Sequence, residues 1–209
     1  MIKKFVLSIF VVLLTALCPF GAFASQPQNK ICLAYCTYYG DKLPDPNIVT
    51  HINYAFAELY VVDGVYKTFK LQGNESRFRQ VMALKKQNPN LKICLAFTHT
   101  VSNSDNRQGG GFSKMSASPE MRKQFAADCL AFCKKWNLDG IDIDWEFPGL
   151  SWSGHASDPK TDTKNYTLLM KDLREALGND YIISFAGYVM DMQSTDSGKK
   201  YVDIQAVVP

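Results

Sequence analysis

The sequence has 209 residues, a formal net charge of +3 and 46% hydrophobic residues, and aromatic residues make up 12% of the chain. This composition excludes a disordered or collagen-like protein. The near-neutral charge gives no electrostatic basis for binding nucleic acid or an anionic membrane, so neither partner is expected.

The amino terminus has the pattern of a secretory signal peptide. Two lysines precede an apolar run at 5–17, and Ala22-Phe23-Ala24 supplies the small residues of a cleavage site. We expect residues 1–24 to be removed and residues 25–209 to form one domain. The apolar run is too short to span a bilayer comfortably. The mature protein is therefore expected to be secreted, periplasmic or held at the cell surface, with no membrane partner after cleavage.

Five short apolar runs predict buried β-strands, and helical patterns separate them. The dipeptide Asp63-Gly64 between two valine-containing segments is the signal of a hairpin turn. Because the runs are apolar almost throughout, they indicate an α/β protein with a parallel sheet covered by helices. The predicted strands are 31–37, 50–59, 91–98, 138–145 and 181–187.

Three helices are predicted between these strands, at about 78–86, 118–136 and 162–177. Ser118 is suited to cap the second helix and Pro119 to its first turn. Cys129 and Cys133 lie one turn apart on the apolar stripe of that helix, which favours small buried residues over metal ligands. Segment 99–114 is rich in Ser, Asn and Gly and is predicted to be a loop across the open end of the sheet.

A row of three acidic residues at the end of the fourth predicted strand is the main candidate for a catalytic site. Asp142, Asp144 and Glu146 alternate with Ile141, Ile143 and Trp145, so on a strand the three carboxylates share one face. Burying three ionised acids side by side is unfavourable, which predicts at least one raised pKa and a general acid near the strand's carboxyl end. A carboxylate metal site, such as one for magnesium, and a solvated strand face are the alternatives that the pattern leaves open.

The segment Asp139-Gly140-Ile141-Asp142-Ile143-Asp144-Trp145-Glu146 resembles the D-x-x-D-x-D-x-E signature of glycoside hydrolase family 18, the chitinases and their relatives. The segment Tyr54-Ala55-Phe56-Ala57 is similar to the family's second-strand motif. The resemblance implies a (β/α)8 TIM barrel whose site lies at the carboxyl ends of its strands. It implies neither a cofactor nor a metal.

The resemblance also implies a substrate-assisted, retaining mechanism on chitin or N-acetylglucosamine oligosaccharides. Glu146 would protonate the glycosidic oxygen, Asp144 would hold the substrate's acetamido group, and Asp142 would share a proton with Asp144. Asp139 and Gly140 are expected to be structural. The aromatic residues expected to form the sugar-binding floor are Tyr35, Phe56 and Trp145.

Two departures from the family pattern stand out. The third strand has Ala96-Phe97-Thr98-His99-Thr100 where the family has S-x-G-G-W, so two glycines are replaced, and His99 is expected to be a loop residue. The second departure is length, because a full barrel needs roughly 250 residues. The sequence after Glu146 reaches only about the fifth strand, and the family's M-x-Y-D motif is absent. The chain is therefore expected to be the truncated first part of a barrel (about strands 1–5), with little activity alone.

An exported endo-acting chitinase is the leading functional hypothesis. An endo-β-N-acetylglucosaminidase acting on N-glycans would use the same acid, although the sequence from Trp145 to Pro148 favours a chitinase. A chitinase-like lectin that binds without cleaving is the non-enzymatic alternative, and the presence of Glu146 argues against it.

Overall fold

The computed structural model describes residues 30–99, 111–149 and 156–187. The predicted signal peptide at 1–24 and the last part of the chain lie outside the described residues. Among the helices that are described, none is both long enough and apolar enough to cross a membrane.

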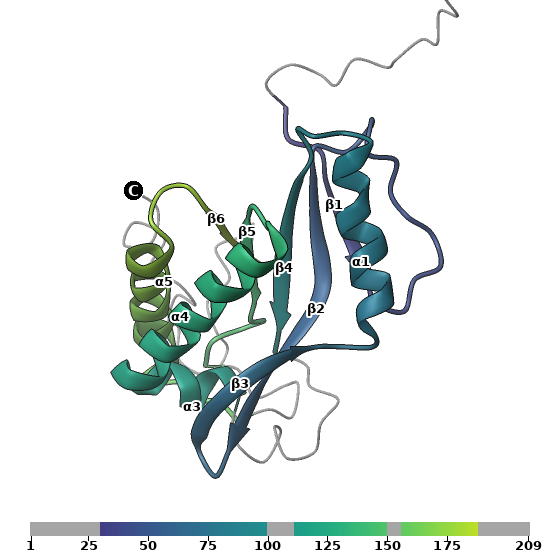
Figure 1. Ribbon diagram of the computed structural model, residues 1–209. Helices are drawn as coiled ribbons and strands as arrows, with labels where there is room; N and C mark the ends of the chain where they lie inside the picture. The colour runs from purple at the N-terminus through teal and green to yellow at the C-terminus, as the bar shows by residue number, and fades with distance from the viewer. Residues whose placement is uncertain (1–29, 100–110, 150–155, 188–209) are drawn as a thin grey trace, which may run out of the picture.

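Five parallel strands form the sheet in the order β1, β2, β4, β5, β6, and β3 pairs with β2 in antiparallel fashion (Figure 1). The β2–β3 hairpin turns at Asp63-Gly64, as predicted, and both residues have positive φ. The predicted strands are confirmed to within a few residues. Their bounds are β1 (Leu33–Thr37), β2 (His51–Val62), β3 (Val65–Leu71), β4 (Lys92–Thr98), β5 (Gly140–Asp144) and β6 (Ile182–Phe185).

The three predicted helices are confirmed as α1 (Glu75–Ala83) with its 3-10 extension η1 (Leu84–Lys86), α4 (Pro119–Trp136) and α5 (Asp162–Leu177). Ser118 caps α4 by accepting the Met121 N–H at 3.3 Å. The predicted loop 99–114 is wrong at its end, because α3 (Gly111–Ala117) begins inside it. Phe112 and Met115 of α3 are buried and lie three positions apart, which is a helical spacing. Their burial outweighs the preference of the nearby Ser and Gly residues for a loop.

The helices pack on one face of the parallel sheet. Phe78 of α1 contacts Tyr54 of β2 with ring centroids 4.9 Å apart, and Phe125 of α4 contacts Phe97 of β4 at 5.0 Å. Cys129 and Cys133, each 1% exposed, lie in this core as free thiols, as predicted. Alternate strand residues point to the opposite face, which therefore remains available for polar side chains.

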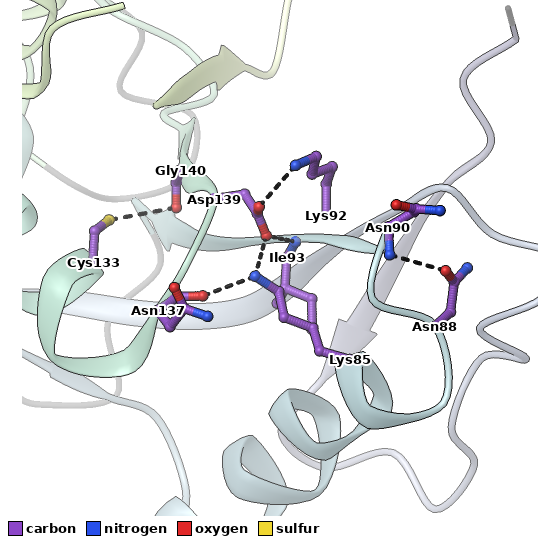
Figure 2. A network of polar contacts seen from close by, with 9 residues as sticks. All are labelled: Lys85, Asn88, Asn90, Lys92, Ile93, Cys133, Asn137, Asp139 and Gly140. Atoms are coloured by element: carbon purple, nitrogen blue, oxygen red, sulfur yellow. Dashed lines mark hydrogen bonds and ion pairs between the residues drawn. The ribbon is translucent and has the colours of Figure 1, made fainter. Parts of the chain in front are cut away.

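Asp139 connects several elements at the amino-terminal end of the parallel strands (Figure 2). Its carboxylate accepts the Ile93 N–H at 2.8 Å and a proton of Lys92 Nζ at 3.2 Å, and it forms an ion pair with Lys85. Lys85 also donates to the carbonyl of Asn137 at 2.8 Å. Burial alone would raise the pKa of Asp139, but these donors hold it below its usual value. Asp139 thus joins β4, η1 and the start of β5, away from the acidic row.

We expect Asp139→Asn to lower the free energy of unfolding at pH 7 by about 1–2 kcal/mol, because the variant loses the charge that accepts these bonds. The depressed pKa makes this contribution present above about pH 4, the pKa of an unfolded aspartate, and lost as the native carboxylate becomes protonated at lower pH. Urea unfolding at pH 7 and pH 3 measures the difference. Glu75→Gln, which removes an exposed ion pair with Arg79, is the control and should change little.

Gly140 opens β5 at a point where β6 approaches closely. A Cβ atom at this position would lie 2.0 Å from the carbonyl oxygen of Ile182. Because that oxygen belongs to backbone, no side-chain rotation relieves the contact, and only glycine allows the two strands to pair here.

Gly140→Ala is expected to destabilise the protein by roughly 2 kcal/mol or more, since β6 must shift away from β5. Chemical denaturation measures the total loss, and hydrogen exchange of the β6 amides locates it. Lys134→Ala on the exposed side of α4 serves as the control. Equal stability of the Gly140 variant and the wild type would contradict the close approach.

Candidate active site

The carboxyl half of β5 carries the acidic row predicted from the sequence. Asp142 and Asp144 share the strand face opposite to the helices. Across the sheet, the positions paired with Asp142 are small, Ala96 on β4 and Ser184 on β6. This leaves room for side chains from more distant strands to reach the Asp142 carboxylate.

Asp142 is 1% exposed, and both of its carboxylate oxygens accept hydrogen bonds. The Tyr35 hydroxyl donates to Oδ2 at 2.7 Å, and the Ser184 hydroxyl donates to Oδ1 at 2.6 Å. Burial raises the pKa of Asp142, and hydrogen bonds from Ser184, Tyr35 and Asn53 oppose that rise. The carboxyl group is thus held by polar groups from three other strands.

Asn53 and Ser184 belong to this site, although the sequence pattern did not single them out. Asn53 is 1% exposed and pairs in register with Tyr35, and its Oδ1 has no hydrogen-bond partner within the described residues. Burial, followed by the hydrogen bond to Asp142, raises the pKa of Tyr35, so its phenol stays protonated and remains a donor. A polar residue in an otherwise apolar strand was the available signal for Asn53.

Asp144 is half-buried and lies two residues beyond Asp142 on the same face. Burial, followed by the negative charges of Glu146 and Asp142, raises the pKa of Asp144 to about 7. A carboxyl group with this pKa exchanges its proton near neutrality, as acid–base chemistry requires. Proton sharing between Asp142 and Asp144 stays a prediction.

The raised pKa of Asp144 predicts a pH-dependent loss of stability. The native carboxyl keeps its proton up to about pH 7, whereas an unfolded aspartate loses it near pH 4. Stability therefore falls as pH rises between these values. Because Asp144→Asn removes the charge and preserves the side-chain size, its midpoint of thermal unfolding should match the wild type near pH 4 and exceed it by a few degrees at pH 8.

Calorimetry across this pH range tests the assignment, with Glu75→Gln as a control that alters one exposed carboxyl group. A difference between Asp144→Asn and the wild type that does not vary with pH would show that Asp144 is not the group with the raised pKa.

Glu146 follows β5 and is half-buried beside Asp144. Its backbone N–H donates to Nδ1 of His99, at the end of β4, at 3.3 Å. His99 therefore lies next to the predicted acid, although the sequence pattern indicated only a loop residue. The structure brings Glu146, Asp144 and Asp142 together in one row at the carboxyl end of the sheet.

Tyr35 and Phe56 line the same end of the sheet. The register of β2 against β4 shifts between Ala55 and Ala57, so Phe56 is the extra residue of a bulge, a feature that redirects a side chain. Its ring centroid lies 6.5 Å from that of Tyr35, which is 46% exposed. The peptide bond Ala55-Phe56 is cis. Tyr35 connects this aromatic pair to the acids, because its hydroxyl donates to Asp142 at 2.7 Å.

Trp145 does not belong to this surface, which corrects the expectation from the sequence. It is 4% exposed and stacks on Phe112 of α3 with ring centroids 5.4 Å apart. Tyr166 of α5 lies on it at 5.3 Å. The reason is strand parity, because the residue between Asp144 and Glu146 must point toward the helices.

A buried carboxylate, Asp162, anchors the segment that follows Glu146. It accepts hydrogen bonds from the Ser113 hydroxyl at 2.8 Å, the Gly149 N–H at 3.2 Å and the Asp158 N–H at 2.7 Å.

Within residues 30–99, 111–149 and 156–187, no three His, Cys, Asp or Glu side chains converge as metal ligands. The Asp142 carboxylate accepts its hydrogen bonds from the hydroxyl groups of Tyr35 and Ser184.

The parallel sheet with helices on one face, and acids at its carboxyl end, is the arrangement of α/β barrel enzymes. Residues 22–208 match the family model described as glycosyl hydrolases family 18. The chain belongs to this family. Chitotriosidase-1 of Mus musculus is 30% identical over 165 residues, covering 79% of this chain and 30% of the relative. Probable chitinase 2 of Drosophila melanogaster is 31% identical over 137 residues, covering 63% and 26%.

Solved structures confirm the fold class. The chitinase domain of the spore coat protein CotE from Clostridium difficile superposes with a TM-score of 0.71 at 28% identity, over 96% of this chain and 51% of that one. The group IV chitinase of Ostrinia furnacalis gives 0.66 at 25% identity, over 86% and 48%. The described residues therefore form part of a TIM barrel, and the chain spans about half of each of these structures.

Proposed function

We propose that this site hydrolyses β-1,4-linked N-acetylglucosamine polymers by a retaining, substrate-assisted mechanism. The observation that carries the proposal is the row of three carboxyl groups at the end of β5, with a pKa of about 7 at Asp144 beside Glu146. The names of the relatives, which are chitinases and a chitotriosidase, favour chitin as the substrate. The amino-terminal pattern at 1–24 favours action outside the cytoplasm.

Glu146 acts as the general acid and donates its proton to the glycosidic oxygen while the bond from that oxygen to the anomeric carbon breaks. The carbonyl oxygen of the substrate's own 2-acetamido group attacks the anomeric carbon and forms a cyclic oxazolinium ion. Water then attacks the same carbon, the ring opens, and the water proton returns to Glu146. Two inversions at one carbon give net retention.

Asp144 supports this cycle because its carboxyl group titrates near neutrality. Its ionised form accepts a hydrogen bond from the acetamido N–H and offsets the positive charge of the oxazolinium ion. Asp142 stays fixed behind it, because Tyr35 and Ser184 bind both of its oxygens. The rings of Tyr35 and Phe56 offer flat apolar surfaces to the pyranose faces.

Glu146→Gln is the decisive variant, because glutamine keeps the size of the side chain and loses the transferable proton. Because this chain alone is expected to have little activity, the assays use the protein at the full length that its gene encodes. There we expect kcat on N-acetylchitohexaose to fall by about 10²–10⁴-fold, while titration calorimetry still detects binding of the oligosaccharide. Proton NMR of the first products from the wild type should show the β-anomer. Turnover retained by the variant would remove Glu146 from the acid role.

Comparison with a high-mannose glycopeptide distinguishes the two enzymatic possibilities, since an endo-β-N-acetylglucosaminidase would release the glycan. Oligosaccharide binding by the wild type without product from either substrate would instead favour a lectin.

A further inference from the structure

The end of β4 contacts the backbone of the predicted acid through a side chain. The His99 N–H donates to the carbonyl of Asp144 at 3.1 Å, which continues the β4–β5 ladder by one step beyond the pair Thr98–Asp144. In a regular parallel ladder, the carbonyl of His99 would next accept the Glu146 N–H. The acceptor here is instead Nδ1 of the His99 imidazole, at 3.3 Å.

We propose that His99 is a positioning residue for Glu146, with its imidazole accepting the Glu146 N–H and fixing the backbone where the acid leaves β5. A residue without a side chain, glycine, could not accept this bond at position 99. His99 is half-buried, so water competes less for the Glu146 N–H than at an exposed strand end.

The direction of the bond determines the state of the ring. The two contacts of Nδ1 require opposite tautomers. Accepting the Glu146 N–H at 3.3 Å needs a lone pair on Nδ1 and the proton on Nε2, whereas donating to the carbonyl of Asp144 at 3.2 Å needs the proton on Nδ1. The proposed role of His99 requires the first tautomer, in which the carbonyl of Asp144 accepts the His99 backbone N–H alone. His99 therefore contacts the backbone on both sides of Trp145.

Placement matters here because proton transfer from Glu146 depends on hydrogen-bond reach to the glycosidic oxygen, and small displacements of a reacting group lower rates strongly. The buried Trp145 side chain anchors the strand from the helix side. His99 anchors the next peptide unit from the β4 side. Together they restrain the backbone of Glu146, and the role proposed for His99 acts through that backbone.

Nitrogen-15 NMR of the full chain tests the contact directly. The Nδ1 resonance of His99 should have the shift of an unprotonated nitrogen at pH 8, and the Glu146 amide should be protected from hydrogen exchange. His99→Ala should remove that protection. His99→Asn places Oδ1 near the position of Nδ1 and should restore it, whereas His99→Gln, whose polar atoms lie further out, should not. A protonated Nδ1, or protection unchanged in His99→Ala, would overturn the contact.

Kinetics test the role, which presupposes the proposed function. His99→Ala should lower kcat on N-acetylchitohexaose about fivefold, the effect of one lost hydrogen bond, with KM little changed. His99→Asn should recover most of the lost rate, and Lys134→Ala is the unaffected control. Thermal unfolding establishes that each variant is folded. Equal kcat in His99→Ala and the wild type would overturn the positioning role. These kinetics also use the protein at the full length that its gene encodes, and there a wild type without turnover, but with the NMR results above, would refute the proposed function and leave the contact intact.

Discussion

The curvature of the sheet is fixed by hydrogen bonds that converge on Asp142. Its carboxylate binds Tyr35 of β1 and Ser184 of β6, which are the two outer strands of the parallel order. Three inter-strand steps separate β1 from β5, about 14 Å in a flat sheet. The Tyr35 hydroxyl can reach Asp142 at 2.7 Å because the sheet bends toward the polar face. Tyr35 thereby lies between Asp142, which its hydroxyl contacts, and Phe56, whose ring centroid is 6.5 Å from its own.

Packing on the helix-covered face of the sheet offsets the unfavourable free energy of burying these carboxyl groups. A buried Asp142 and a half-buried Asp144 with a raised pKa are unfavourable to folding at neutral pH. The apolar residues of the same strand lie against the helices, and Ile143 and Trp145 are almost fully buried there. Because side chains alternate along β5, the carboxyl groups lie on one face of the strand and the apolar residues that pack against the helices lie on the other.

Much of this could be predicted from the sequence because the signals are local. Strand and helix positions follow from apolar patterns and end signals such as Ser118, and the acidic row follows from alternation in β5. The site residues that the sequence did not indicate are non-local. Ser184 and Asn53 join the site only through the pairing of strands far apart in the sequence. Trp145 was assigned to the sugar-binding floor from family resemblance, although its own parity already indicated the core.

The anchoring of two backbone positions on one carboxylate has a consequence for the segment between them. Gly149 and Asp158 both donate to Asp162, so the two ends of the intervening segment meet at a fixed point on α5. The entropy of closing a loop grows only slowly with its length. A longer segment between these two residues would therefore add little to the cost of folding, because Gly149 and Asp158 remain bound to Asp162.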